Sequence, residues 1–235
     1  MTNQSDNQEE ITHWFNNTYR NRGSWYLRPK HAYYIYLEIL GAKANQKLLD
    51  VACGLGRLLE ASEEYGVLPY GIDISQVAIS KAQERFPQFN LKVANAENLP
   101  FDNNTFDLIT CIGSIERMVN TEKALKEMLR IGKENSKYCF LVRNSETTSW
   151  QFFKSFLGLK NKKGHQDAKN LEEWTNIFSS VGFEILKVYP DQYPLMKSLR
   201  RKNLWLKKVN YKDVIENQMP LEKANEFLFL LRKND

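Results

Sequence analysis

The sequence predicts an α/β fold in which a doubly wound parallel sheet carries helices on both faces. Two observations favour this class. Short apolar stretches typical of buried strands alternate with amphipathic, helix-like stretches from residue 47 to the C-terminus. The first strand-like stretch runs directly into the glycine turn Gly54-Leu55-Gly56. A strand, a glycine turn and a helix together form the first half of a nucleotide-binding site.

Composition indicates a soluble globular chain. With 235 residues, of which 42% are hydrophobic and 26% charged, it is long enough for one domain with insertions and a substantial core. No apolar run approaches the roughly 20 residues of a membrane span. The first residues, MTNQSDNQEE, are polar and acidic, unlike a secretory signal or a basic transit peptide. We therefore expect a cytoplasmic protein.

The three cysteines predict neither a disulfide framework nor a metal site. Cys53, Cys111 and Cys139 are far apart, and each lies in or beside an expected strand. They lack the paired spacing that disulfide scaffolds and zinc sites need. We interpret them as small buried side chains in a reducing compartment.

Residues 1–46 are predicted to form an N-terminal helical cap. Aromatic residues are dense between 10 and 40 and recur with helical spacing. Pro29 is expected to open the second helix of the cap, and Gly41 to end it. For most of these aromatic side chains we favour a helix packed across the sheet edge.

Residues 47–235 are predicted to form the main α/β domain. Ser75 is a suitable N-cap for one helix, which Pro87 stops. Further helices are expected to open at Arg57 and to span 121–133 and 171–181. The expected strands are, in chain order, 48–52, 68–73, 89–94, 106–113, 136–143, 183–189 and 227–232.

Two segments interrupt this alternation, and we interpret them as insertions near 144–170 and 190–222. The first holds an aromatic cluster followed by a polar, glycine-bearing tract, and we expect it to order over the site when a ligand binds. The second has seven basic residues and no acidic one within 197–212, whereas the whole chain has a net charge of +5. A solvated face, an anionic acceptor and peripheral contact with an acidic membrane are the alternatives for it.

Motifs at the expected strand ends carry a family resemblance. Asp73 ends the second strand, 19 residues after Gly54. Residues 95–101 follow the third strand, and 106–113 form the fourth. In this order and spacing they resemble the class I methyltransferases that use S-adenosylmethionine, in the small-molecule branch of the ubiquinone and menaquinone methyltransferases. The resemblance implies a Rossmann-like seven-stranded sheet of order 3-2-1-4-5-7-6 whose last strand is antiparallel.

The resemblance also implies S-adenosyl-L-methionine as the cofactor, bound beyond the carboxyl ends of the strands. A dinucleotide is disfavoured, because Leu59 stands where its fingerprint needs a third small residue. Asp73 is expected to accept hydrogen bonds from ribose hydroxyls. Asn95, where the family often has Asp, is expected to meet the adenine edge. The full expected cofactor-binding set is Asp50, Ala52, Gly54, Gly56, Asp73, Ile74, Asn95, Ala96, Glu97, Ile112 and Gly113.

The acceptor side offers three catalytic candidates. Many small-molecule members have histidine where Arg117 stands, and arginine is not a base at neutral pH. Arg117 is therefore either a partner for an acidic acceptor or a solvated charge. Glu116 is a candidate base or cofactor contact, and His165 lies in the first insertion. No metal is expected, because the leaving sulfur becomes neutral.

The favoured function is transfer of a methyl group to an oxygen or nitrogen of a small-molecule acceptor, with an acidic acceptor as one alternative. A second hypothesis is an RNA or protein methyltransferase that docks through 197–212. Nucleic acid is disfavoured as a partner, because the chain carries no added RNA-binding module. A third hypothesis is a binding protein that keeps the cofactor without catalysis. By resemblance, N-terminal segments close over the cofactor in such families, which makes Tyr19, Tyr26 and Arg28 candidate lid residues.

Overall fold

The computed structural model describes residues 4–21, 27–147, 167–191 and 220–234. The predictions for Tyr26, His165, the aromatic cluster of the first insertion and the basic segment 197–212 lie outside the described residues. Within the described residues, no helix combines the length and the apolar character that a membrane span requires.

Seven strands form one sheet in the order β3-β2-β1-β4-β5-β7-β6. All neighbouring strands are parallel except β7, which runs antiparallel to both β5 and β6. The predicted order and the antiparallel last strand are confirmed. The strands are β1 (Lys47–Val51), β2 (Leu68–Asp73), β3 (Asn90–Val93), β4 (Phe106–Ile112), β5 (Gly132–Arg143), β6 (Phe183–Pro190) and β7 (Glu226–Lys233).

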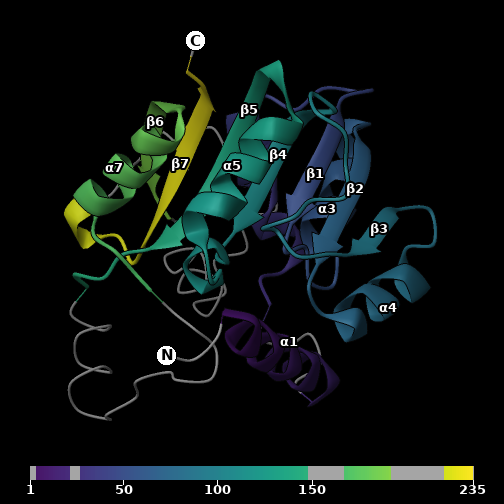
Figure 1. Cartoon of the computed structure of the whole chain (residues 1–235). Helices are drawn as coiled ribbons and strands as arrows, with labels where there is room; N and C mark the ends of the chain where they lie inside the picture. The colour runs from purple at the N-terminus through teal and green to yellow at the C-terminus, as the bar shows by residue number, and fades with distance from the viewer. Residues whose placement is uncertain (1–3, 22–26, 148–166, 192–219, 235) are drawn as a thin grey trace, which may run out of the picture.

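Helices cover both faces of this sheet (Figure 1). Met128 of α5 and Phe178 of α7 pack in the core on one face, and Leu37 of α2 and Leu59 of α3 pack on the other. The helices are α1 (Gln4–Asn21), α2 (Tyr34–Leu40), α3 (Arg57–Ser62), α4 (Gln76–Arg85), α5 (Thr121–Ile131) and α7 (Leu171–Val181). Short 3-10 turns are η1 (Lys30–Ala32), η2 (Glu63–Tyr65), η3 (Ile115–Arg117) and η4 (Leu221–Lys223).

Most element boundaries agree with the sequence prediction. β2 and α7 occupy the predicted residues 68–73 and 171–181. β5 begins earlier than predicted, at Gly132, because a register shift opposite β4 lets its first residues join the sheet. Pro29 precedes a 3-10 turn instead of opening α2 directly. Gly41 ends α2 in the left-handed conformation, as predicted.

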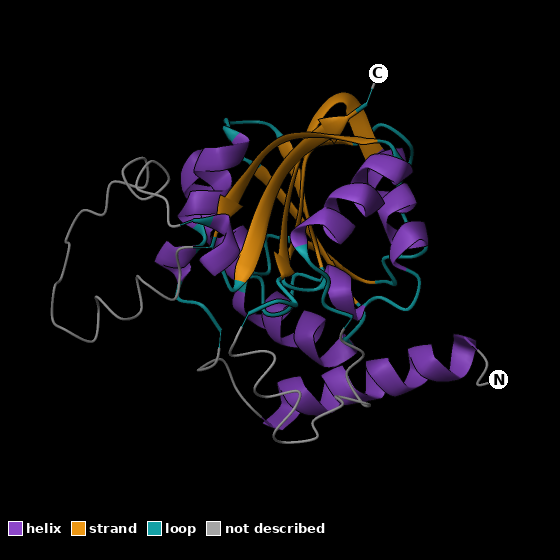
Figure 2. Ribbon diagram, turned by 90° about the vertical axis from the view of Figure 1, so that its left-hand side faces the viewer, coloured by secondary structure: helices purple, strands orange, loops and turns teal. Residues whose placement is uncertain are grey.

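The helix α1 lies across one end of the sheet (Figure 2). In that view it is the long helix beside the N-terminal label, and it crosses beyond the strand ends. Ile11 and Tyr19 of α1 border the same cavity as Asp73, the last residue of β2. The predicted packing across the sheet edge is therefore wrong for α1, because its apolar face covers the carboxyl ends of the strands.

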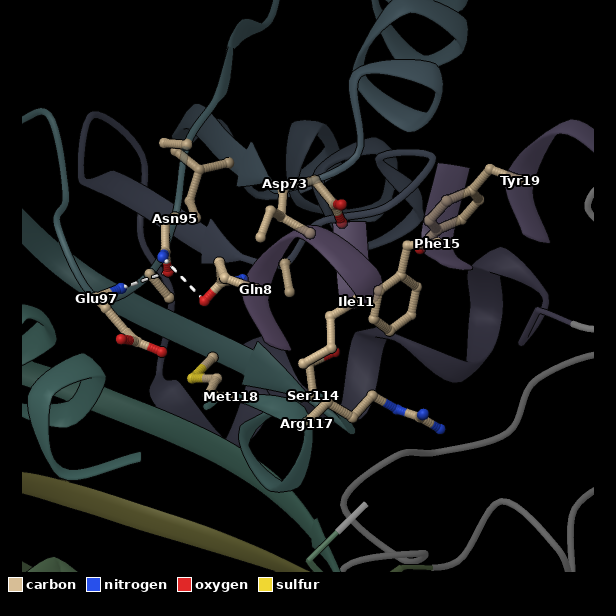
Figure 3. Close-up of a pocket in the computed structure, with 15 residues that line it drawn as sticks. Gln8, Ile11, Phe15, Tyr19, Asp73, Asn95, Glu97, Ser114, Arg117 and Met118 are labelled. Atoms are coloured by element: carbon tan, nitrogen blue, oxygen red, sulfur yellow. Dashed lines mark hydrogen bonds between the residues drawn. The ribbon is translucent and has the colours of Figure 1, made fainter. Parts of the chain in front are cut away.

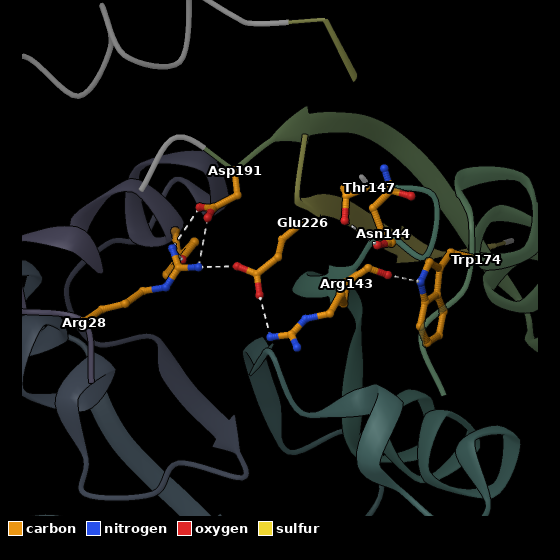
Figure 4. A network of polar contacts seen from close by, with 8 residues as sticks. Arg28, Arg143, Asn144, Thr147, Trp174, Asp191 and Glu226 are labelled. Atoms are coloured by element: carbon orange, nitrogen blue, oxygen red, sulfur yellow. Dashed lines mark hydrogen bonds and ion pairs between the residues drawn. The ribbon is translucent and has the colours of Figure 1, made fainter. Parts of the chain in front are cut away.

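A buried ion network ties the chain after α1 to the last two strands (Figure 4). Arg28 donates to the two carboxylate oxygens of Asp191, at 2.8 and 2.9 Å, and to Glu226 at 2.5 Å. It also donates to the hydroxyl of Tyr36 at 2.9 Å, and Arg143 lies 3.6 Å from the other oxygen of Glu226. Arg28 thus anchors the cap to the sheet, which is a different role from the lid residue that the sequence suggested.

Arg28→Met should lower the free energy of unfolding by about 3–5 kcal/mol, because it removes the guanidinium that donates to the Asp191 and Glu226 carboxylates. Asp191, one of those carboxylates, is only 5% exposed. Urea denaturation followed by circular dichroism measures the loss. Lys126→Met is the control, since Lys126 forms an exposed pair with Glu122 and its removal should cost less than about 1 kcal/mol. Equal losses in the two variants would contradict the anchoring role.

Candidate functional site

The chain leaves β1 through a strained turn. Ala52, Gly54 and Gly56 all have positive φ, at 61°, 54° and 72°. A left-handed alanine is uncommon, and such outliers cluster at functional sites. A Cβ on Gly54 would lie 2.7 Å from the hydroxyl oxygen of Tyr19, so no larger residue fits there without a shift. The turn therefore allows another group to approach its backbone closely.

Asp73 holds this turn from the end of β2. Its carboxylate accepts the backbone N–H of Gly54 and the backbone N–H of Ser75, both at 2.8 Å. The residue is 4% exposed, and burial raises the pKa of Asp73 to about 6 although these N–H donors oppose the rise. Ser75 in turn caps α4, since its hydroxyl oxygen accepts the N–H of Ala78 at 3.2 Å. One carboxylate thus fixes both the glycine turn and the start of α4.

Asp50 is a second buried carboxylate beside the turn. The hydroxyl of Thr110 donates to it over 2.7 Å. Burial raises the pKa of Asp50 to about 7; the Thr110 hydrogen bond opposes this rise and the nearby Asp73 adds to it. A carboxylate with so high a pKa lacks a stabilising cation, so a bound cationic group would be favoured next to it.

A small cavity of 70 Å³ lies next to these acids (Figure 3). Asp73 and Tyr19 border it on one side, and Asn95 and Glu97 on the other. The Asn95 side-chain oxygen accepts the N–H of Glu97 at 2.9 Å, which shapes the loop after β3. The cavity has room for only a few water molecules. Of the predicted cofactor residues, it is lined by Ala52, Asp73, Ile74, Asn95, Ala96 and Glu97.

A larger cavity of 260 Å³ is lined by the glycine turn and by side chains of α1. The two cavities are neighbours, because both are lined by Phe15, Tyr19, Ala52, Ser114 and Arg117. The remaining predicted cofactor residues that line the larger one are Asp50, Gly54, Ile112 and Gly113. The structure thus brings together the whole predicted set except Gly56, which lies beside Phe86 instead.

Polar contacts fasten α1 to α4 over these cavities. The Asn16 side-chain oxygen accepts the hydroxyl of Ser75 at 2.7 Å and the N–H of Val77 at 3.2 Å. Lys81 donates to the backbone carbonyl of Tyr19 at 2.7 Å. Since Ser75 is also held by Asp73, the same few residues hold the turn and the helix that covers it.

On the face of α1 toward the smaller cavity, only Tyr19 was a candidate lid residue in the sequence, and it lines both cavities. Gln8, Ile11 and Phe15 line the smaller cavity at helical spacing with it and were missed, and Asn95 donates to the side-chain oxygen of Gln8 at 3.2 Å. The periodicity is visible in the sequence, but periodicity does not say what a helix face covers. Ser114 and Met118, beside η3, also line this cavity and carried no sequence motif.

The catalytic candidates occupy different surroundings. Arg117 of η3 lines both cavities, and its guanidinium lies 5.9 Å from the ring centroid of Trp14 and 5.8 Å from that of Phe15. Glu116 lines neither cavity; it is 1% exposed, and neither of its carboxylate oxygens has a hydrogen-bond partner among the described residues. Burial raises the pKa of Glu116. His165 lies outside the described residues.

Comparisons with known proteins agree with this geometry. Residues 49–140 match the family model described as a methyltransferase domain. A demethylmenaquinone methyltransferase of Paenarthrobacter aurescens is 34% identical over 99 residues, which cover 42% of this chain and 39% of the relative. A norajmaline N-methyltransferase of Rauvolfia serpentina is 33% identical over 97 residues, covering 38% and 33%. The chain therefore spans less than half of the length of these relatives.

Solved structures share the fold along most of the chain. The structure of the YcgJ protein of Bacillus subtilis superposes with a TM-score of 0.63 at 19% identity, covering 87% of this chain and 99% of that one. The strand order and the superposition define the fold as that of the class I methyltransferases, and residues 49–140 match the methyltransferase domain model. Within the class, the chain resembles the menaquinone and ubiquinone branch, as predicted.

The raised pKa of Asp50 has a testable consequence for stability. Between the ordinary carboxyl pKa near 4 and about 7, the folded chain holds a proton on Asp50 that the unfolded chain releases, so stability falls as the pH rises. Asp50→Asn keeps the acceptor for Thr110 and removes the buried charge. The free energy of unfolding of Asp50→Asn minus that of the wild type should be larger at about pH 8 than at about pH 5, by roughly 1–3 kcal/mol. Thermal unfolding at the two pH values measures this difference.

Asp107→Asn is the control with the opposite sign. Although burial opposes it, Lys133, at 2.7 Å, and the backbone N–H of Lys47, at 2.9 Å, lower the pKa of Asp107. The ionised Asp107 carboxylate stabilises the folded protein at pH values above its pKa in the unfolded chain, and this stabilisation is lost as the pH falls. Asp107→Asn should therefore be less stable than the wild type at about pH 8. The same sign for both variants would contradict the analysis of Asp50.

Proposed function

We propose that this protein is an S-adenosylmethionine-dependent methyltransferase that acts on a small molecule. The observation that carries the proposal is the pair of adjoining cavities at the Asp73-held glycine turn, lined by ten of the residues that the family resemblance nominates. The names of the matched relatives support the same reaction class. In this proposal residues 1–46 act as a cap over a main domain of residues 47–235.

The residues of the site fit the chemistry of the cofactor. When bound, S-adenosylmethionine supplies a methyl group on a cationic sulfur. The buried Asp50 carboxylate suits the cationic end of the molecule, and the larger cavity beside Gly54 and Gly113 holds that end. Asp73 suits the ribose hydroxyls, since its oxygens keep lone pairs beyond the two N–H groups they accept.

The adenine side of the proposal rests on the smaller cavity. Ile74 and Met118 offer apolar surface there, and Asn95 and Ala96 offer polar atoms for an adenine edge. Gln8, Ile11 and Phe15 of α1 form one wall of this cavity and cover the strand ends beneath it. We infer that α1 moves outward to admit the cofactor and closes over it again.

The acceptor in this proposal is a small molecule methylated at oxygen or nitrogen. Aromatic side chains of α1 and η1–α2, among them Trp14 and Tyr33, wall the larger cavity and suit an enclosed organic molecule. Arg117 in the same wall favours an acidic acceptor over a basic one. The contribution of the chain is to hold the acceptor in line with the methyl group, and such positioning supplies several kcal/mol of barrier reduction.

Calorimetry with S-adenosylhomocysteine tests the cofactor site. The wild type should bind it, and Asp73→Ala should weaken binding by about 1.5–3 kcal/mol, because hydrogen bonds to a charged acceptor are lost. Asp102→Ala is the matched control: Asp102 is an exposed acid in the loop before β4, so affinity should not change. If a folded Asp73→Ala variant bound S-adenosylhomocysteine with unchanged affinity, the assignment of Asp73 to the ribose site would be contradicted.

Hydrogen exchange tests the motion of α1. Amides of α1 should exchange more slowly once S-adenosylhomocysteine is bound, whereas those of α7 should not respond. Asn95→Asp keeps the acceptor for Glu97 and removes the donor to Gln8. In the free protein it should speed exchange in α1 about 2–10-fold, the equivalent of one hydrogen bond. Ligand-independent exchange of α1 would contradict its role as a cover.

A further inference from the structure

Arg117 stands at the junction of the two cavities. It belongs to η3, directly after β4, and lines both cavities together with Phe15, Tyr19 and Ser114. Figure 3 shows its side chain running past Ser114, with the guanidinium pointing away from Asn95 and Glu97. Arg117 is thus placed where it can contact a group bound in either cavity.

The rings of α1 fix the surroundings of this cation. Trp14 and Phe15 pack edge to face, with centroids 4.8 Å apart and planes 87° apart. The Arg117 guanidinium lies within 6 Å of both ring centroids, which is the range of a cation–π contact. A planar fork of N–H donors bordered by aromatic faces matches a flat molecule that carries an anionic oxygen.

The wall of the larger cavity contains both an acidic and a basic residue. Asp50 of β1 and Gly54 of the following turn line this cavity together with Arg117, which lies in η3 after β4. Gly113 lines it too, and a Cβ built there would meet no atom of the described residues within 4 Å. A cationic group at Asp50 and an anionic group at Arg117 would therefore share one cavity.

Resting on the proposed function, we propose that Arg117 binds the acceptor, and that the acceptor is a planar phenol or enol in its ionised form. The acceptor loses its proton to solvent before the reaction, and the guanidinium stabilises the resulting oxyanion. The electron pair of that oxygen forms the new bond to the methyl carbon as the bond from carbon to sulfur breaks. Anion and sulfonium both become neutral, so no side chain has to act as a base.

The groups around Arg117 are compatible with this role. Burial lowers the pKa of Arg117, yet arginine stays protonated at neutral pH. The other ionisable groups that act on it are Glu116 of the same turn, Arg143 of β5, Tyr19 of α1 and Glu226 of β7. Glu226 also forms an ion pair with Arg28.

The probe for this site is 4-nitrophenol, whose neutral and ionised forms absorb at different wavelengths. An optical titration of the probe bound to wild-type protein saturated with S-adenosylhomocysteine reports the pKa of the bound phenol. We expect this pKa to fall by about one unit relative to the free probe, a tenfold preference for the anion. Arg117→Met should abolish the shift, and Arg117→Lys should restore part of it.

Controls separate charge, shape and folding. Arg232→Met removes a half-exposed arginine on β7 and should leave the shift intact. Nitrobenzene, which lacks the ionisable oxygen, should bind the wild type and Arg117→Met alike. An unshifted pKa, a shift that persists in Arg117→Met, or no binding of the probe at millimolar concentration overturns the proposal. Failure of the wild type to bind S-adenosylhomocysteine would instead contradict the proposed function.

Discussion

The hydrogen bond from the Gly54 N–H to the Asp73 carboxylate is the contact on which the site depends. It joins the turn after β1 to the end of β2, and it forms because the parallel register sets Val51 opposite Ile72, one residue before Asp73. The N–H of Cys53 donates to the carbonyl of Ile72 at 2.8 Å and extends the ladder into the turn. The strained turn is therefore held by the sheet itself, so its geometry exists before any ligand arrives.

The cost of this arrangement is two buried carboxylates, Asp50 and Asp73, whose pKa values burial raises. A protein tolerates buried charge of this kind where binding or catalysis uses it. The substitution of Asn for the family's usual Asp at position 95 fits the same electrostatic constraint. A carboxylate at position 95 would add to the negative charge of Asp73 and Glu97 around the smaller cavity, whereas the amide donates to Gln8 and helps to hold α1 in place.

The sheet order, and the gathering of the motif residues at the strand ends, could be predicted from the sequence, because both depend on local patterns. Residues 68–73 form β2 as predicted, since an apolar run between turn residues has few alternatives. The position of α1 could not be predicted, because a helical stripe such as Ile11, Phe15 and Tyr19 packs equally well against a sheet edge or over strand ends. Long-range ion pairs were also invisible: Arg28 and Asp191 are 163 positions apart, and nothing local links them.

The two parts of the N-terminal segment are attached by contacts of different kinds, and in the proposed function this difference favours opening at α1. Arg28 is held by charged hydrogen bonds to Asp191 and Glu226 in a buried setting, so detaching it would expose unpaired charges inside the protein. By contrast, the polar contacts of α1, such as those of Asn16 and Gln8, are neutral and worth about 0.5–1.5 kcal/mol each, and apolar packing such as that of Ile11 adds to them. In the proposed function, an opening of α1 therefore leaves no buried charge without its partner, unlike a displacement of the segment that begins at Arg28. Because Phe15 and Tyr19 of α1 line both cavities, this movement would open the two cavities together.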